Sequence, residues 1–184
     1  MSLPGDGGPG AVALRELVMP VVVVAASDQN ETACATSTTS YVSLQPAILC
    51  VALTPASRTA QLVTRTGKFS VSVLAADQAD LAQRAGRKAA GPDKLAAVGI
   101  SPEQPPGAGG AAGACGPPGV AGAAAVLWCE VCDVVTVGDH QVIFGQVAAV
   151  RGAADDTALL LRYHRRYLST GQPVTPPAPD GYPI

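Results

Sequence analysis

The feature that most constrains the fold is a pair of long β-type segments joined by a tight turn. Residues 123–137 and 141–150 are rich in β-branched and apolar side chains, and only Gly138, Asp139 and His140 separate them. Glycine followed by aspartate is typical of hairpin turns, which need backbone conformations that glycine adopts without strain. The sequence therefore predicts a long antiparallel hairpin around which the rest of the chain is arranged.

Shorter runs of the same character predict further strands, at residues 21–26, 47–53, 68–74 and 157–161. Residues 32–41 contain good strand formers but lack large apolar anchors. Two helices are expected between the strands, at residues 59–66 after a cap in residues 54–57, and at residues 77–87 with Asp77 as the cap and Leu81 on the apolar face. Six or seven strands with two short helices favour a mostly antiparallel barrel or sandwich over a βαβ array.

Two segments are unsuited to regular structure. Residues 99–119 consist largely of Gly, Ala and Pro, a composition that predicts a mobile surface excursion within one domain. The segment from Gly171 onwards contains five prolines in fourteen residues, so it is not expected to form helix or strand.

Charge and hydropathy exclude several classes of function. A net charge of −2 with 14% charged residues argues against a large basic surface for nucleic acid or for anionic membranes. The mean hydropathy is +0.27, yet no apolar run approaches the roughly 18–20 residues that span a bilayer, and the run at 18–26 is interrupted by Pro20. The first ten residues lack the features of a signal peptide, and five cysteines form an odd set suited to a reducing compartment, so we expect a cytoplasmic protein without membrane association.

Cys129 and Cys132 form a C-x-x-C pattern within the first long β segment. Residues three apart in a strand point to opposite faces, and no further ligands lie nearby in the sequence. We therefore expect plain thiols and no metal site.

Two short polar stretches allow either a structural or a ligand-binding role. Thr36, Ser37, Thr38, Thr39 and Ser40 form an edge strand, or they let the backbone approach a planar ligand rich in hydrogen-bonding groups. Ser57, Arg58 and Thr59 form a simple helix cap with a solvated arginine, or they bind a phosphate at the start of the helix.

His140 and the segment Tyr163, His164, Arg165, Arg166 and Tyr167 leave the same choice open. They are solvated turn and tail residues, or they meet the phosphates and amide of a dinucleotide. The sequence contains no G-x-G-x-x-G, P-loop, G-x-S-x-G or H-E-x-x-H motif, which removes Rossmann, P-loop and the corresponding hydrolytic sites.

Taken in order, these segments resemble the flavin reductase-like family of split-barrel proteins, which includes the reductase components of two-component flavin monooxygenases. The resemblance covers residues 14–168, between a flexible tail at 1–13 and a Pro-rich tail at 169–184. It rests on the segments at residues 35–46, 57–59, 67–74, 77–82, 138–140 and 159–167, together with the strand around Cys129.

The resemblance implies a homodimer of antiparallel Greek-key split barrels that binds FMN or FAD without a covalent bond. It implies reduction of that flavin by hydride transfer from NADH or NADPH, with delivery to a separate monooxygenase. The residues it assigns to the flavin are Thr36, Ser37, Thr38, Thr39, Tyr41, Val42, Ser57, Arg58 and Thr59. It assigns the nicotinamide side to His140, as the catalytic residue, and to Arg165, Arg166 and Tyr167.

The chain departs from the family pattern at several positions. Ser72 stands where the family often has Asn, Ala47 where a second Pro is common, and an Arg replaces the Gly that precedes the closing Tyr. The principal alternative is a flavin-binding or carrier protein without useful reductase activity. A more remote alternative, an enzyme similar to pyridoxine phosphate oxidase, lacks the expected Arg/Lys-rich phosphate clusters in this sequence.

Overall fold

The computed structural model describes residues 9–107, 116–152 and 157–171. Within them the chain is mostly β with short helices, and every ladder between named strands is antiparallel. The strands are β1 Met19–Pro20, β2 Val22–Ser27, β3 Thr32–Ser37, β4 Thr39–Leu44, β5 Ala47–Leu53, β6 Lys68–Val73, β7 Pro102–Glu103, β8 Gly119–Val120, β9 Ala125–Val137, β10 His140–Arg151, β11 Leu160–Tyr163 and β12 Arg166–Ser169. The helices are α1 Pro9–Ala13, a 3-10 turn Leu14–Glu16, α2 Arg58–Thr66, α3 Ala79–Gly86 and α4 Lys94–Ala97.

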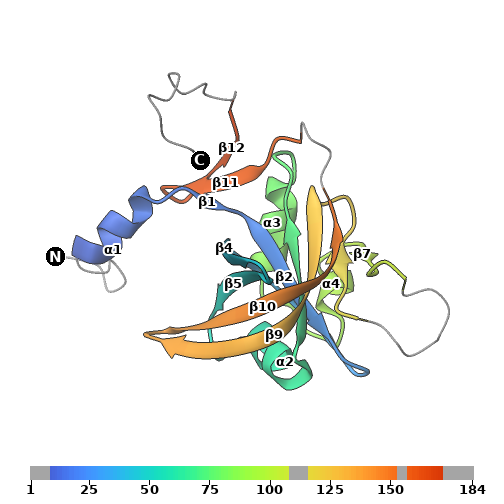
Figure 1. Ribbon diagram of the computed structural model, residues 1–184. Coiled ribbons are helices and arrows are strands. Elements are labelled where there is room, and N and C mark those ends of the chain that lie inside the picture. The colour runs from blue at the N-terminus through green and yellow to red at the C-terminus, as the bar shows by residue number, and fades with distance from the viewer. Residues whose placement is uncertain (1–8, 108–115, 153–156, 172–184) are drawn as a thin grey trace.

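The predicted hairpin organises the molecule, as β9 and β10 form the longest ladder (Figure 1). Gly138 and Asp139 make the turn, with Gly138 at φ +60°, and His140 already pairs with Val137. His140 is therefore the first residue of a strand, whereas the sequence placed it within the turn.

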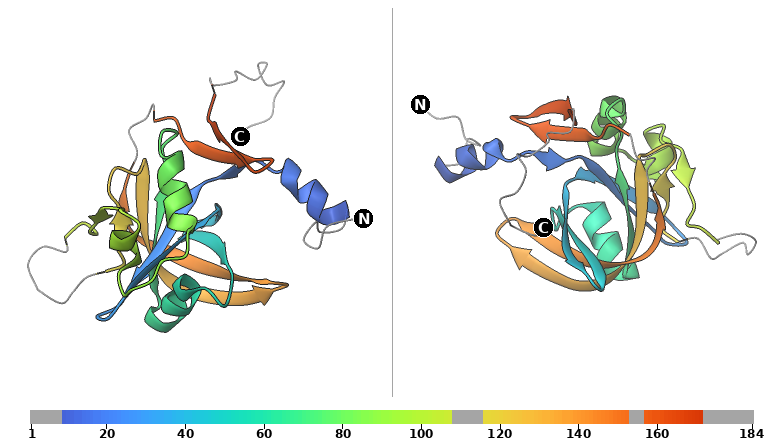
Figure 2. Two further views of the ribbon diagram at one scale, coloured as in Figure 1. Left: turned by 180° about the vertical axis from the view of Figure 1, so that it is seen from behind. Right: turned by 45° about the horizontal axis from the view of Figure 1, so that its top comes forward.

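The seven-stranded sheet has the order β3-β2-β6-β9-β10-β5-β4. Its two edge strands, β3 and β4, are consecutive in the chain and only Thr38 lies between them. The sheet must therefore curl until its edges meet at Thr38, which makes it a barrel. A second, three-stranded sheet of order β1-β11-β12 lies beside the barrel (Figures 1 and 2).

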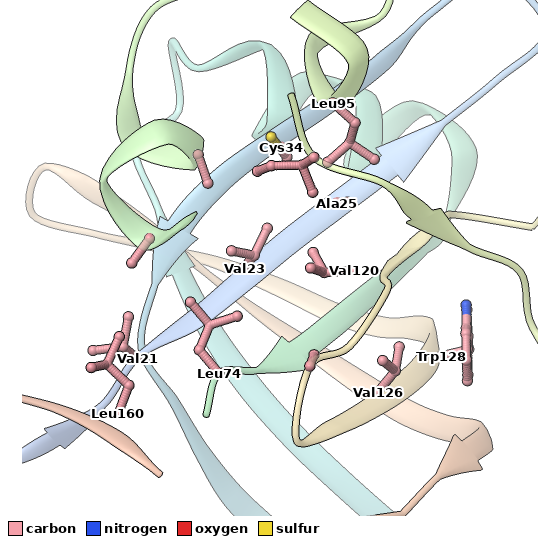
Figure 3. Packing of buried hydrophobic residues seen from close by; sticks show 14 residues of the cluster. Val21, Val23, Ala25, Cys34, Leu74, Leu95, Val120, Val126, Trp128 and Leu160 are labelled. Atoms are coloured by element: carbon pink, nitrogen blue, oxygen red, sulfur yellow. The ribbon is translucent and has the colours of Figure 1, made fainter. Parts of the chain in front are cut away.

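The run of valines in β2 is buried on both faces because each face meets a different core. Val22 and Val24 point into the barrel, where Leu62 and Val63 of α2 join them, and Figure 2 shows α2 within the curve of the strands. Val23 and Ala25, with Val21 just before the strand, point outward toward Leu74 after β6 and toward residues of β8, β9 and α4 (Figure 3). We call this second cluster the outer core.

The helices differ slightly from the expectation. Ser57 caps α2 as predicted, since its Oγ accepts a hydrogen bond from the Ala60 N–H at 3.1 Å. The second predicted helix begins two residues late, and Asp77 does not cap it; Gln78 precedes α3 and its Oε1 accepts instead from the Ala75 N–H. Leu81 is half-buried and packs against the outer core, while Ala82 and Ala85 are the buried residues of the helix.

The Gly/Ala/Pro segment is described only at its two ends, where β7 and β8 pair; residues 108–115 and the tail beyond Gly171 lie outside the described residues. Ser70 and Ser72, both buried, hold its returning end. Ser70 Oγ donates to Pro118 O at 2.6 Å, and Ser72 Oγ accepts from the Val120 N–H at 2.9 Å. No helix in the described part of the chain is long and apolar enough to cross a membrane.

Candidate functional site

A cleft of about 640 Å³ opens beside the edge strand β3, in the size range of small-molecule sites. Residues 34–36 of β3 form one wall, and Thr54 and residues 56–59 at the start of α2 form the second. The third consists of residues 85–89 at the end of α3 and just after it, together with Lys94 of α4. Three elements that are far apart in the sequence therefore converge on it.

The charge of this cleft is strongly one-sided. Among the described residues, four cations and no carboxylate line it: Arg58, Arg87, Lys88 and Lys94. Arg58 is partly neutralised, because its Nη2 donates to Glu31 Oε2 at 2.9 Å. The Arg87 and Lys88 side chains make no hydrogen bond or ion pair with another described residue, so they are free to meet an anion.

The start of α2 adds a second anion-binding feature. The first N–H groups of a helix have no intrahelical acceptor and carry partial positive charge. Ser57 satisfies only one of them, and Thr59 lines the cleft although it is 2% exposed. Ser57, Arg58 and Thr59 thus line one cleft at the start of α2, together with Arg87, Lys88 and Lys94.

Lys94 is a residue that the sequence analysis missed. Its Nζ donates to Cys34 O at 2.6 Å and to Ala85 O at 2.9 Å, which ties β3 to the end of α3. Burial raises the pKa of the Cys34 thiol, while the charge of Lys94 acts in the opposite direction. The signal available in the sequence was a group of cations around the Gly91–Pro92 turn after a helix.

The hydroxyl run at residues 36–40 closes the barrel. Thr36 Oγ1 donates to Ala82 O at 2.6 Å, Ser37 Oγ to Ala52 O at 2.8 Å, and Thr39 Oγ1 to Cys50 O at 2.9 Å. These bonds join the meeting edges of the sheet to β5 and α3. Both readings of the run therefore have a basis, since its small side chains hold the barrel shut and also leave Thr36, Ser37 and Thr38 lining clefts.

A second cleft of about 260 Å³ adjoins the first, and Thr36 lines both. It contains Met19–Val21, Thr36–Thr38, Ala52, His140 and Arg162. His140 Nδ1 lies 2.7 Å from Asp139 Oδ1, and this contact lowers the pKa of Asp139. A carboxylate that accepts the Nδ1 proton fixes the imidazole so that Nε2 remains for a ligand.

Other predicted residues lie away from these clefts. Tyr41 and Val42 are on β4 and are 75% and 51% exposed, and Thr39 lines neither cleft. Arg165 lies in the turn between β11 and β12, and Arg166 lines a separate hollow with Tyr163, His164 and Leu168. Tyr167 packs against the outer core.

Arg162 is the cation that this hairpin contributes to the second cleft, and the sequence analysis did not select it. Alternation along β11 gives it the face opposite to Tyr163, but the sequence alone does not show which face meets His140.

Cys129 is buried and Cys132 is exposed, which matches the opposite faces expected of them. Burial, with a smaller contribution from Cys132, raises the pKa of the Cys129 thiol to about 12, so this thiol is unreactive at neutral pH. Within the described ranges, no three His, Cys, Asp or Glu side chains group as metal ligands would.

The reductase subunit HsaB of a flavin-dependent monooxygenase from Mycobacterium tuberculosis is 30% identical over 109 residues, which are 59% of this chain and 52% of that protein. The matched stretch is therefore about half the length of this relative.

Solved structures share the fold. The NADH:FAD oxidoreductase SgcE6 of Streptomyces globisporus C-1027 superposes with a TM-score of 0.77 at 21% identity, over 94% of this chain and 99% of that one. Nitrilotriacetate monooxygenase component B from Mycobacterium thermoresistibile gives 0.75 at 24% identity, over 91% and 89%. The expected split-barrel fold is thus confirmed.

The model of one family, described as "Flavin reductase like domain", matches residues 14–171. Since that range includes both clefts and nearly all of the described strands and helices, the chain belongs to the flavin reductase-like family.

Proposed function

We propose that this chain binds FMN or FAD non-covalently and catalyses its reduction by NADH or NADPH. The observation that carries the proposal is the pair of adjoining clefts that share Thr36. One is lined, among the described residues, by four cations and no carboxylate, and it suits the phosphate end of a flavin nucleotide. The other is lined by His140 and by the small side chains of Thr36–Thr38 and Ala52, and suits the stacking of two rings.

The residues present fit such a group. Ser57, the start of α2, and Arg87 and Lys88, whose side chains pair with no other described residue, would hold phosphate. Thr36, Ser37 and Thr38 would allow close approach of a flat ring system. A flavin bound there would supply N5 as the acceptor of a hydride, that is two electrons and one proton, from C4 of a nicotinamide, which would thereby be oxidised. The protein's part is to position both rings at contact distance and to exclude water, which requires no activated nucleophile.

The phosphate site is tested by comparing FMN with riboflavin, which lacks the phosphate. Lys88→Met is expected to weaken FMN binding by roughly fivefold to tenfold, because it removes one charge-assisted contact, and to leave riboflavin binding nearly unchanged. Lys68→Met is the control, since it removes one positive charge outside both clefts. Fluorescence titration of the flavin measures both affinities, and equal losses for FMN and riboflavin would contradict the assignment.

His140→Ala tests the reductase function. We expect flavin affinity to be preserved, while the rate of NADH-driven bleaching falls tenfold to a hundredfold, about 1–3 kcal/mol of transition-state stabilisation. Stopped-flow absorbance measures the rate. If the wild-type protein binds flavin but neither NADH nor NADPH bleaches it, the flavin-carrier alternative holds instead.

The family and the monooxygenase reductase subunit among the relatives support a further proposal, that the reduced flavin serves a separate monooxygenase. We also propose a domain spanning residues 14–168, between tails at 1–13 and 169–184. In the described part of the chain the first tail includes the short helix α1.

A homodimer is proposed from the apolar side chains that β4 leaves exposed. Tyr41, Val42 and Leu44 are 75%, 51% and 76% exposed on an edge strand, and a second copy would remove them from water. Analytical ultracentrifugation of the wild type and of Leu44→Glu tests this. A wild-type monomer with flavin bound would contradict it.

A further inference from the structure

Arg162 occupies the centre of the small sheet, in the middle strand β11. Its direct cross-strand neighbours are Met19 on β1 and Tyr167 on β12. Directly opposed residues of antiparallel strands share a face, so these three side chains form one row. Met19 and Arg162 both line the second cleft, together with His140.

The guanidinium of Arg162 has no acidic partner among the described residues. Its one interaction is with the ring of Tyr167, whose centroid lies 5.7 Å from the guanidinium carbon. Glu16, a carboxylate that contacts this hairpin, interacts with other residues. Its Oε2 accepts from the Tyr163 hydroxyl at 3.0 Å, and its Oε1 lies 3.0 Å from His164 Nε2. Of the residues that the structure describes, Arg162 and the ionisable His140 are the charged or ionisable side chains that line the cleft.

An arginine without a carboxylate partner, beside a cleft and stacked on an aromatic ring, is suited to bind an anion. The planar guanidinium donates two parallel hydrogen bonds to phosphate oxygens. Stacking on the Tyr167 ring already restricts the arginine side chain, so less conformational entropy is lost when an anion binds. Arg165 and Arg166 of the same hairpin do not line this cleft.

We propose that Arg162 binds the phosphate on the nicotinamide ribose of the hydride donor, while the nicotinamide lies beside His140. This inference rests on the proposed reductase function. The phosphate is common to NADH and NADPH, so Arg162 would contribute to the binding of both donors without choosing between them.

The test compares Arg162→Met with Arg162→Lys in the flavin-loaded protein. For Arg162→Met we expect the donor concentration that half-saturates bleaching to rise about tenfold, equally for NADH and NADPH. Dihydronicotinamide riboside, which has no phosphate, is expected to react as with the wild type. Arg162→Lys keeps the charge without the two parallel donors. Its half-saturating donor concentration is expected to lie between the values for the wild type and for Arg162→Met.

Two further measurements separate this contact from a structural role. Titration calorimetry with NAD⁺ reads donor binding without turnover, and Arg162→Met is expected to weaken it by the same factor. FMN affinity and the thermal unfolding midpoint are expected to stay at wild-type values. Lys68→Met, which also removes one positive charge, controls for general electrostatic attraction.

Several outcomes would overturn the proposal. These are an unchanged NAD⁺ affinity in Arg162→Met, an equal loss for the riboside, a loss confined to NADPH, or a larger loss in Arg166→Met. A wild type that binds NAD⁺ yet does not reduce flavin overturns the reductase function alone, since the calorimetry still decides the Arg162 contact. A wild type that binds no NAD⁺ overturns the Arg162 proposal.

Discussion

At the scale of single residues, the turn between β11 and β12 places two bulky side chains in a backbone conformation that favours glycine. His164 has φ 47° and Arg165 has φ 64°. A two-residue hairpin turn with both φ values positive normally contains Asn-Gly, since a Cβ in that region meets the backbone. Arg166, which stands directly before the closing Tyr167, follows this turn as the first residue of β12. His164 retains a compensating contact, as its Nε2 lies 3.0 Å from Glu16 Oε1.

Arg165→Gly is therefore expected to stabilise the protein by about 0.5–1 kcal/mol, because relief of the left-handed strain outweighs the added freedom of the unfolded chain. Urea unfolding followed by circular dichroism measures the change. The same variant bears on the expected role of Arg165 in donor binding. An increase in the NADH concentration needed for half-maximal bleaching would place Arg165 at the donor, whereas a loss of stability would contradict the strain argument.

At the scale of elements, the pairing of β9 with β10 depends on one small residue. Gly145 lies on β10 at a register shift of this ladder, next to residues that pack inside the barrel. A Cβ at this position would stand 2.4 Å from Phe69 Cζ and 2.9 Å from Cys129 Cβ, and the Phe69 side chain is fully buried. Phe69 thus fills the space that a side chain at position 145 would need.

Gly145→Ala is expected to cost about 1–3 kcal/mol, as Phe69 or the backbone of β10 must shift in a close-packed core. Gly152→Ala is the matched control, because a Cβ there meets no atom of another described residue within 4 Å, and its effect is expected to stay within about 0.5 kcal/mol. Denaturant midpoints of the two variants decide the matter. Similar midpoints would show that the core around Phe69 has room for a methyl group.

At the scale of the whole molecule, a group of charges joins the β2–β3 turn to α2 beside the larger cleft. Arg65 Nη2 donates to Asp28 Oδ2 and to Glu31 Oε1, each at 2.7 Å, and Arg58 donates to Glu31. Hydrogen bonding lowers the pKa of Glu31, chiefly by Arg65 and then by Arg58. The pKa of Asp28 is lowered by the Asn30 N–H first and by Arg65 second.

These pKa values are lower in the folded protein than in the unfolded chain, where they lie at about 4. The carboxylates therefore stabilise the fold fully at pH values above the unfolded-state pKa. This stabilisation is lost as the pH falls through the folded-state pKa. Glu31→Gln is therefore expected to be less stable than the wild type at pH 7, with the two stability curves converging toward pH 2. Urea midpoints between pH 7 and pH 2 test this. Curves that remain parallel down to pH 2 would contradict it.

The sequence alone determined the elements whose cause is local. Turn chemistry at Gly138–Asp139, the cap at Ser57 and the valines of β2 each specify structure within a few residues, and the structure has a hairpin turn, a helix cap and a strand at these places. The turn is one residue shorter than predicted, since His140 already belongs to β10. It also determined the family and the fold, because the order of the motifs along the chain identifies both. The individual roles of the site residues stay predictions.

Only the tertiary structure decided which side chains share a cleft. The barrel closes at Thr38, and β3 lies next to α3 and Lys94. Lys94 donates a hydrogen bond to the carbonyl oxygen of Cys34, although the two residues are 60 positions apart in the sequence. The small sheet of β1, β11 and β12 then turns Arg162 toward His140 and leaves Arg165 and Arg166 outside that cleft. Sequence patterns specify local conformation and alternation of faces, whereas the face that meets a ligand depends on packing between distant strands.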